Sequence, residues 1–174
     1  MSRVEAAPAV TVAAEDPAGA DAQALMAALS QALAAITGSD GRASFDVEDV
    51  RGARARFAVA RDAQGRALGC GALRPLAEGG AEDVAEIKRM FAVPGSAGVG
   101  SAVLAFLEAE AARLGYAQAW LETRLVNAHA VTFYERRGYA RIANYGRYRG
   151  NEAAVCFGKR LSPALGIARD PRGP

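Results

Sequence analysis

The pattern of apolar and polar positions along the chain predicts alternating helices and strands. Leu25, Leu29 and Leu33 recur at four-residue spacing, which places them on one face of a helix. Asp21 can cap that helix and Gly38 can end it. The first clear element is therefore an amphipathic helix.

The period changes to alternation in the next part of the chain. Residues 56–60 and 67–73 have the two-residue period of strands, and the turn Asp-Ala-Gln-Gly lies between them, which predicts a β-hairpin. The other predicted elements are a short strand at residues 10–13, a short helix within 45–52, a strand at 84–93, a helix from near Gly100 to Gly115, a strand at 117–123, a helix capped by Asn127 and ended by Gly138, and closing strands at 139–142 and 153–159.

This order of elements predicts an α/β or mixed α+β fold. We expect a single domain over residues 10–161, with a central mixed, twisted sheet of about six to seven strands flanked by about four helices. The strand, helix and strand between residues 84 and 123 imply a right-handed parallel crossover. Residues 1–9 are predicted to be a disordered lead and residues 162–174 a loose tail.

Composition and charge exclude some classes of protein. The chain has 174 residues, of which 51% are hydrophobic, and a net charge of +2, so it can form one core but offers no strongly basic face for nucleic acid. No apolar run approaches the roughly 20 residues that span a bilayer. The N-terminus lacks the apolar core of a signal peptide, and Cys70 and Cys156 are predicted to be buried free thiols. No cluster of side chains has metal-ligand spacing. We therefore predict a cytoplasmic protein without a membrane or nucleic-acid partner and without a metal.

A loop of small residues, Gly-Ser-Ala-Gly-Val-Gly at residues 95–100, separates the strand at 84–93 from the following helix. The first N–H groups of a helix have no intrahelical partner and carry partial positive charge, so this loop is suited to holding phosphate. A plain tight turn explains the composition equally well. A Rossmann loop would need a third glycine and a Walker A loop would need a lysine, so a dinucleotide-binding enzyme is disfavoured.

Three segments in combination resemble the GNAT superfamily of N-acetyltransferases. They are Lys-Arg-Met-Phe-Ala-Val-Pro at residues 88–94, Gly-Val-Gly-Ser-Ala-Val-Leu at 98–104, and Asn-Ala-His-Ala-Val-Thr-Phe-Tyr-Glu-Arg-Arg-Gly-Tyr at 127–139. The resemblance implies a sheet whose fourth and fifth strands splay apart to admit acetyl-CoA as co-substrate. It also implies transfer of the acetyl group, by direct attack, to a primary amine of a small-molecule or peptide acceptor. The sequence leaves open whether the protein is a monomer or a homodimer.

The resemblance also assigns roles to individual residues. Tyr134 would protonate the departing thiolate, because a phenol keeps its proton at neutral pH. Glu86 would remove a proton from the amine, with Glu122 as the reserve candidate. For Glu86 the structural alternative is pairing with its neighbours Lys88 and Arg89. The cofactor-binding residues implied by the resemblance are Met90, Phe91, Ala92, Val93, Ala97, Gly98, Val99, Gly100, Ser101, Asn127 and Tyr134.

The glycine loop departs from the family pattern, because Gly95 stands where the family carries arginine or glutamine and the loop is shorter. Backbone donors survive this change, so the N–H groups of residues 97–101 could still hold a pyrophosphate. Those near residues 91–93 would polarise the thioester carbonyl. The alternative function is a degenerate GNAT-like sensor or interaction module that binds acyl-CoA without catalysis.

Two further features have more than one interpretation. Residues 143–151 are either a solvated hairpin or a wall of the acceptor pocket, in which Arg147 would favour a carboxylate. Cys70 could in principle carry the acetyl group, but no base is visible beside it and direct transfer is the family's usual route.

Overall fold

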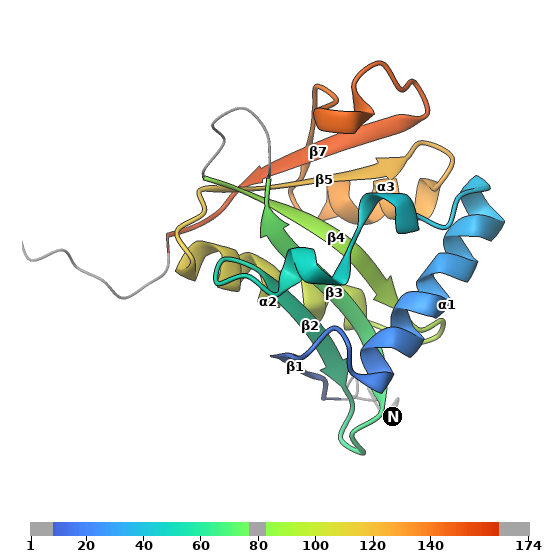
Figure 1. Cartoon of the computed structure of the whole chain (residues 1–174), viewed down its shortest axis with the longest axis vertical. Coiled ribbons are helices and arrows are strands. Elements are labelled where there is room, and N and C mark those ends of the chain that lie inside the picture. The colour runs from blue at the N-terminus through green and yellow to red at the C-terminus, as the bar shows by residue number, and fades with distance from the viewer. Residues whose placement is uncertain (1–8, 77–82, 164–174) are drawn as a thin grey trace, which may run out of the picture.

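The computed structural model describes residues 9–76 and 83–163 (Figure 1). Most of the predicted lead at residues 1–9 and tail at 162–174 lies outside the described residues. In the described part of the chain, no helix is long and apolar enough to cross a membrane. The elements in chain order are β1 (Thr11–Ala14), α1 (Ala20–Thr37), η1 (Arg42–Ser44), η2 (Val47–Val50), β2 (Arg56–Arg61), β3 (Ala67–Pro75), β4 (Val84–Ala92), α2 (Val99–Arg113), β5 (Gln118–Arg124), α3 (Ala128–Arg136), β6 (Ala140–Ile142), η3 (Gly146–Tyr148) and β7 (Ala154–Arg160).

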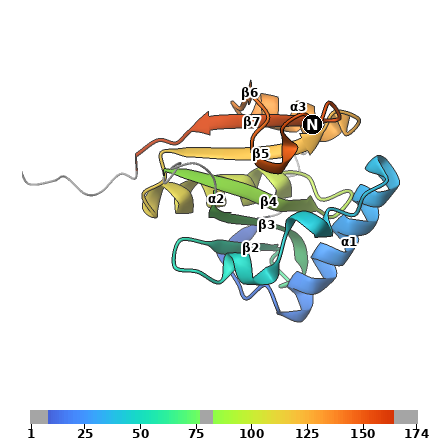
Figure 2. The same cartoon turned by 45° about the horizontal axis from the view of Figure 1, so that its top comes forward.

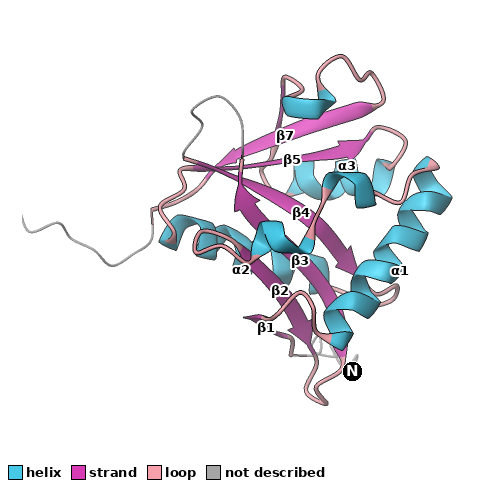
Figure 3. Cartoon of the chain, viewed as in Figure 1, coloured by secondary structure: helices cyan, strands magenta, loops and turns pink. Residues whose placement is uncertain are grey.

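The strands form one seven-stranded sheet in the order β1-β2-β3-β4-β5-β7-β6. All neighbouring strands are antiparallel except β4 and β5, which are parallel and are connected through α2. Helix α1 lies on one face of the sheet, and α2 and α3 lie on the other (Figures 1 and 3). The predicted mixed sheet is confirmed. The described residues contain three α-helices, and the short helix expected within residues 45–52 is the 3₁₀ turn η2.

Apolar side chains fill both faces of the sheet. The larger core lies under α2 and α3, where Leu107 and Phe157 are completely buried. Each such side chain contributes about 1.5–3 kcal/mol through its burial. The smaller core packs Leu25 and Met26 of α1 on strands β2 and β3. Helices therefore cover both faces of the sheet.

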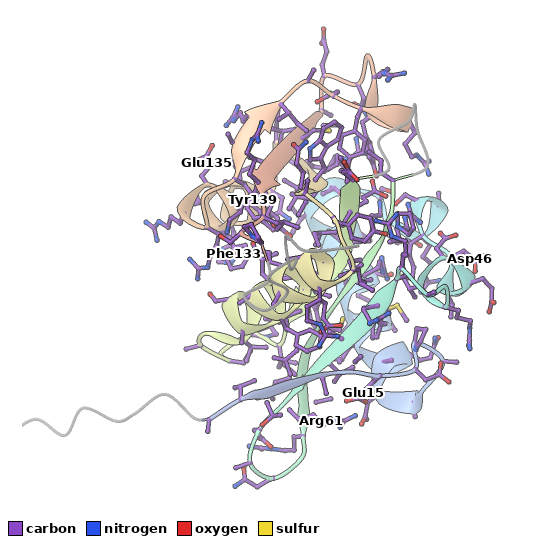
Figure 4. All side chains as sticks on the ribbon, turned by 90° about the vertical axis from the view of Figure 1, so that its left-hand side faces the viewer. Glu15, Asp46, Arg61, Phe133, Glu135 and Tyr139 are labelled. Carbon is purple, nitrogen blue, oxygen red and sulfur yellow. The ribbon has the colours of Figure 1, made fainter. Side chains whose placement is uncertain are left out.

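The beginning of α1 differs in detail from the prediction. Gly19, not Asp21, is the N-cap residue, and Asp21 lies in the first turn, where its carboxylate accepts a hydrogen bond of 2.8 Å from Arg61. Glu15 accepts two more from the same guanidinium, at 2.7 and 2.9 Å, and Figure 4 shows the two side chains together. A carboxylate in the first turn is also favoured by the helix dipole. Gly38 ends the helix as predicted, with a left-handed φ of 75°.

The parallel strands β4 and β5 separate soon after they begin. They pair only over Val84–Glu86 and 118–120, after which β5 stays with β7 and β4 stays with β3 (Figures 1 and 2). A bulge in β4 lies at the same level, where Arg89 has a φ of 54°. A bulge bends a strand and increases its twist, so it helps to turn β4 away from β5. This separation leaves an opening in the sheet between β4 and β5.

Candidate active site

The opening between β4 and β5 holds a cleft of about 200 Å³. Its walls come from β4, β5, α1, α3 and the two 3₁₀ turns η1 and η3. The side chains that line it and could take part in proton transfer or charge recognition are Lys88, Glu122, Arg124, Tyr134, Arg147 and Tyr148. Glu86, the first candidate for the base, does not line this cleft.

Glu86 is held by two partners on the α1 face of the sheet. Its Oε1 accepts a hydrogen bond of 3.0 Å from Arg74 Nε and is ion-paired with Nη2 of the same guanidinium at 2.9 Å, and its Oε2 accepts a hydrogen bond of 2.8 Å from the Tyr145 hydroxyl. The residue is 5% exposed. The expected pairing of Glu86 with Lys88 or Arg89 is wrong, because the bulge directs Arg89 to α1, where it donates to Met26 O and Ser30 Oγ. Glu86 is therefore committed to partners outside the cleft and is poorly placed to take a proton from a substrate bound there.

Glu122, unlike Glu86, lines the cleft and has a carboxylate oxygen that accepts no hydrogen bond. It lies on β5 where the strand leaves β4, and its side chain is 12% exposed and lines the cleft. Its Oε1 makes no hydrogen bond, although Arg124 Nε lies 3.4 Å away. Burial raises the pKa of the Glu122 carboxyl, which the charges of Arg124 and Lys88 oppose in part. A carboxylate that lines a cleft, is largely shielded from water and has an oxygen without a hydrogen bond is suited to act as a base.

Lys88 faces the same cleft from β4. Its ammonium donates hydrogen bonds to the Tyr148 hydroxyl at 2.8 Å and to Ser44 Oγ at 3.0 Å. Burial lowers the pKa of Lys88. Among the described residues, no carboxylate oxygen lies within 4 Å of its Nζ. The loop at residues 143–151 is not a solvated hairpin, because Tyr145 and Tyr148 are each 5% exposed and pack on the sheet.

Tyr134 reaches the cleft from the other face of the sheet. It lies in α3, whose first turn is capped as predicted, since the Asn127 side chain accepts a hydrogen bond of 3.2 Å from Ala130 N. The Tyr134 ring packs against Phe133, Tyr139 and Phe157, with centroids 5.1–6.3 Å apart. Burial raises the pKa of the hydroxyl, so it keeps its proton at neutral pH.

The glycine loop lies between β4 and α2, and its residues 95–101 are not among those that line the cleft. Gly98, with a φ of 79°, is the N-cap of α2, and the first N–H to bond within the helix is that of Ala102, which donates to Gly98 O. The N–H groups of residues 99–101 therefore remain available to an anion. Gly95 has a φ of 84°, which side chains other than glycine rarely adopt, so an arginine there would strain the loop.

A cation nevertheless lies at this helix end. The guanidinium of Arg137 donates a hydrogen bond to Ser101 Oγ in the first turn of α2 and stacks 4.8 Å from the Phe133 ring centroid. Figure 4 labels Phe133, which this guanidinium contacts, and its α3 neighbour Glu135. Arg137 lies inside the Glu-Arg-Arg-Gly part of the third segment, but its partner Ser101 is 36 residues away, so the sequence alone does not reveal this contact.

The implied cofactor-binding residues divide into three groups. Met90, Asn127 and Tyr134 line the cleft, whereas residues 97–101 lie at the start of α2 and are not part of that lining. Phe91 and Val93 pack against the α1-side core instead, and Ala92 packs against the other core. The Val93 N–H donates to Leu68 O at 2.8 Å, so it is not free to polarise a carbonyl as expected.

Cys70 has no access to the cleft. Its side chain is completely buried under α1, and its Sγ donates to Arg89 O at 3.4 Å. Burial raises the pKa of the thiol to about 12. A thiolate is the nucleophilic form, so the structure argues against a covalent route through this residue.

The comparisons with known proteins agree with this geometry. Residues 23–139 match the Acetyltransferase (GNAT) family. A protein of Azospirillum brasilense named IAA acetyltransferase is 32% identical over 156 residues, which cover 88% of this chain and 99% of that protein. A solved structure assigned as an acyl-CoA N-acyltransferase of Klebsiella pneumoniae is 28% identical, with a TM-score of 0.73 over 88% of this chain and 98% of that chain.

More distant structures share the fold. The ribosomal-protein-S18-alanine N-acetyltransferase of Escherichia coli superimposes with a TM-score of 0.62 at 19% identity, covering 95% of this chain and 99% of that chain. The chain described here belongs to the GNAT acetyltransferase family. It is an acyl-CoA-dependent N-acyltransferase with acetyl-CoA as its co-substrate.

Proposed function

We propose that the protein transfers an acetyl group from acetyl-CoA to a primary amine of a small-molecule or peptide acceptor, with Glu122 as the general base and Tyr134 as the general acid. The observation that carries this proposal is that both side chains line one cleft and approach it from opposite faces of the sheet. The acceptor would enter on the α1 side, and the acyl donor would lie toward α2 and α3.

The two proton transfers suit the states of the two groups. An amine is mostly an ammonium at neutral pH and must lose a proton before it can attack. Glu122 can take that proton, directly or through a water, because its Oε1 accepts no hydrogen bond and its raised pKa makes it a stronger base. Tyr134 remains protonated and can donate its proton to sulfur as the carbon–sulfur bond breaks. Acetyl-CoA supplies the activated acetyl thioester.

The glycine loop and Arg137 support binding of the acyl donor. The N–H groups of residues 99–101 and the guanidinium of Arg137 place positive potential at the N-terminus of α2. This arrangement suits a pyrophosphate. It also replaces the charge that is missing from the loop at Gly95. Cys70 and Cys156 are buried free thiols, which supports the further proposal that the protein works in the reducing cytoplasm.

Two measurements test the function. Acetyl-CoA should raise the apparent melting temperature, because a ligand that binds the native state stabilises it. CoA release across a panel of primary amines should then exceed that of Tyr134→Phe, which keeps the ring and loses the proton. A thermal shift without CoA release for any amine would favour the sensor alternative, and the absence of any shift with millimolar acetyl-CoA would contradict both.

A further inference from the structure

Lys88 and Glu122 form an unusual pair of buried charges. They face one cleft from the two strands that separate there, and each influences the other electrostatically. They are nevertheless more than 4 Å apart, since no ion pair joins them. Glu122 pairs instead with Arg124, whose Nε lies 3.4 Å from its Oε1, whereas Lys88 has only hydroxyl partners. A charge held away from bulk water without an opposite charge is costly, so the space beside Lys88 suits the anionic group of a ligand.

The surroundings of Lys88 direct its ammonium toward such a ligand. An ammonium has three donors, and here Tyr148 and Ser44 take two of them. Both partners are hydroxyls, which orient the ammonium but do not neutralise it. The Tyr148 ring lies 5.5 Å from Nζ and adds a cation–π contact. One donor and the full charge remain for an anion in the cleft.

The rim of the cleft near Lys88 is also positive. Arg147 is fixed by a hydrogen bond of 2.7 Å from its guanidinium to Ala43 O, and it lines the cleft. Arg124 lines it from β5 beside Glu122. Lys88 and Arg147 both come from outside β5, whereas the single buried carboxylate of the cleft is on β5. The cleft therefore has an excess of positive charge, which favours a ligand with a carboxylate, and Glu122 is the acidic group that can meet an ammonium.

We propose that the acceptor is a small amino acid-type zwitterion, a molecule that carries a carboxylate beside its primary amine. Lys88 binds the carboxylate, with Arg147 at the rim, and Glu122 receives the ammonium and removes its proton. This inference rests on the proposed function and names its substrate class. The cleft volume of about 200 Å³ is below the range of about 300–1,000 Å³ typical of sites for drug-sized ligands, which favours a small acceptor.

The test uses matched pairs of acceptors. The common L-amino acids other than proline and their C-terminal amides share the side chain and a primary amine and differ in the carboxylate. Because the carboxylate raises the pKa of the neighbouring amine, kcat/KM is compared per unprotonated amine. For the amino acids that are acetylated, kcat/KM should exceed that of the amide by about tenfold to hundredfold, the value of a charge-assisted hydrogen bond. Lys88→Met should bring this ratio close to one, and Lys88→Arg should keep a preference for the acid. Arg141→Met removes an exposed cation on β6 and should leave the ratio unchanged.

The result that overturns the inference is equal use of acid and amide by the wild type, or a ratio that Lys88→Met does not change. If Lys88→Met fails to fold, Tyr148→Phe provides a second variant that removes one hydroxyl from the ammonium and should lower the ratio. If no amine releases CoA, the proposed function has failed, and calorimetry still tests the subsite. Wild-type protein saturated with CoA should then bind an amino acid at least tenfold more tightly than its amide. Equal binding would overturn the inference.

Discussion

The Tyr145 hydroxyl donates a hydrogen bond of 2.8 Å to Oε2 of Glu86, while Arg74 occupies Oε1. This contact joins the loop after β6 to the centre of the sheet, at the level where β4 and β5 are still paired. Glu86 therefore acts in our interpretation as a structural group. Its contacts hold β4 to the loop after β6, and we assign proton transfer to Glu122.

Glu86→Gln tests that interpretation. The substitution keeps the shape of the side chain and removes the charge that pairs with Arg74, so the free energy of unfolding should fall by about 2–3 kcal/mol. The kcat should fall less than tenfold, since no proton passes through Glu86. Urea denaturation and steady-state kinetics measure the two effects. Tyr145→Phe should reproduce the loss of stability at about 1 kcal/mol. A large loss of kcat in a folded Glu86→Gln protein would restore this residue as the base.

Glu122→Gln should have the opposite profile. The substitution leaves the size of the side chain unchanged and removes the proton acceptor, so kcat should fall by about 10²–10⁴-fold. The KM for acetyl-CoA should change little, because Glu122 lies on the acceptor side. Glu86→Gln is the matched control, since it makes the same chemical change on the neighbouring strand. Equal kcat values for the two variants would contradict the assignment of the base.

The raised pKa of Glu122 predicts the pH dependence of both activity and stability. Catalysis needs the carboxylate, so kcat/KM should fall as the pH drops through a pKa above the ordinary 4.5, and this acidic limb should be lost in Glu122→Gln. The free energy of unfolding should have the opposite dependence on pH. A pKa raised by folding gives a contribution that is complete below pH 4.5 and is lost as the pH rises through the folded-state value. The unfolding free energy of the wild type should therefore decline relative to that of Glu122→Gln over this interval, as measured by urea denaturation.

Arg137 should contribute to binding of the acyl donor. It lies at the N-terminus of α2 through its hydrogen bond to Ser101, so Arg137→Ala should raise the KM for acetyl-CoA about tenfold, the value of one charge-assisted hydrogen bond. The kcat at saturation should be nearly unchanged. Arg136→Ala is the control, because Arg136 is exposed on the same turn of α3. If both variants raise the KM equally, general charge and not the position of Arg137 is responsible.

Local sequence patterns were sufficient for the elements, but not for the side-chain partners. Alternation over β2 and β3 and the cap at Asn127 depend on neighbours within a few residues, so they could be predicted. The partners of Glu86 could not, because Tyr145 is 59 residues away in the chain and reaches it only through the order β4-β5-β7-β6. The pairing of Arg137 with Ser101, 36 residues apart, likewise depends on how α3 packs beside α2.

Tyr134→Phe tests the remaining proton transfer. The phenyl ring keeps the contacts with Phe133, Tyr139 and Phe157, so the free energy of unfolding should change by less than about 1 kcal/mol. Without the hydroxyl the departing thiolate loses its proton donor, and kcat should fall by about 10²-fold. Tyr139→Phe is the matched control. It removes the hydroxyl that donates to Glu108 at 3.0 Å, and neither Tyr139 nor Glu108 lines the cleft. A kcat for Tyr134→Phe equal to that of Tyr139→Phe would show that solvent, and not Tyr134, protonates the leaving group.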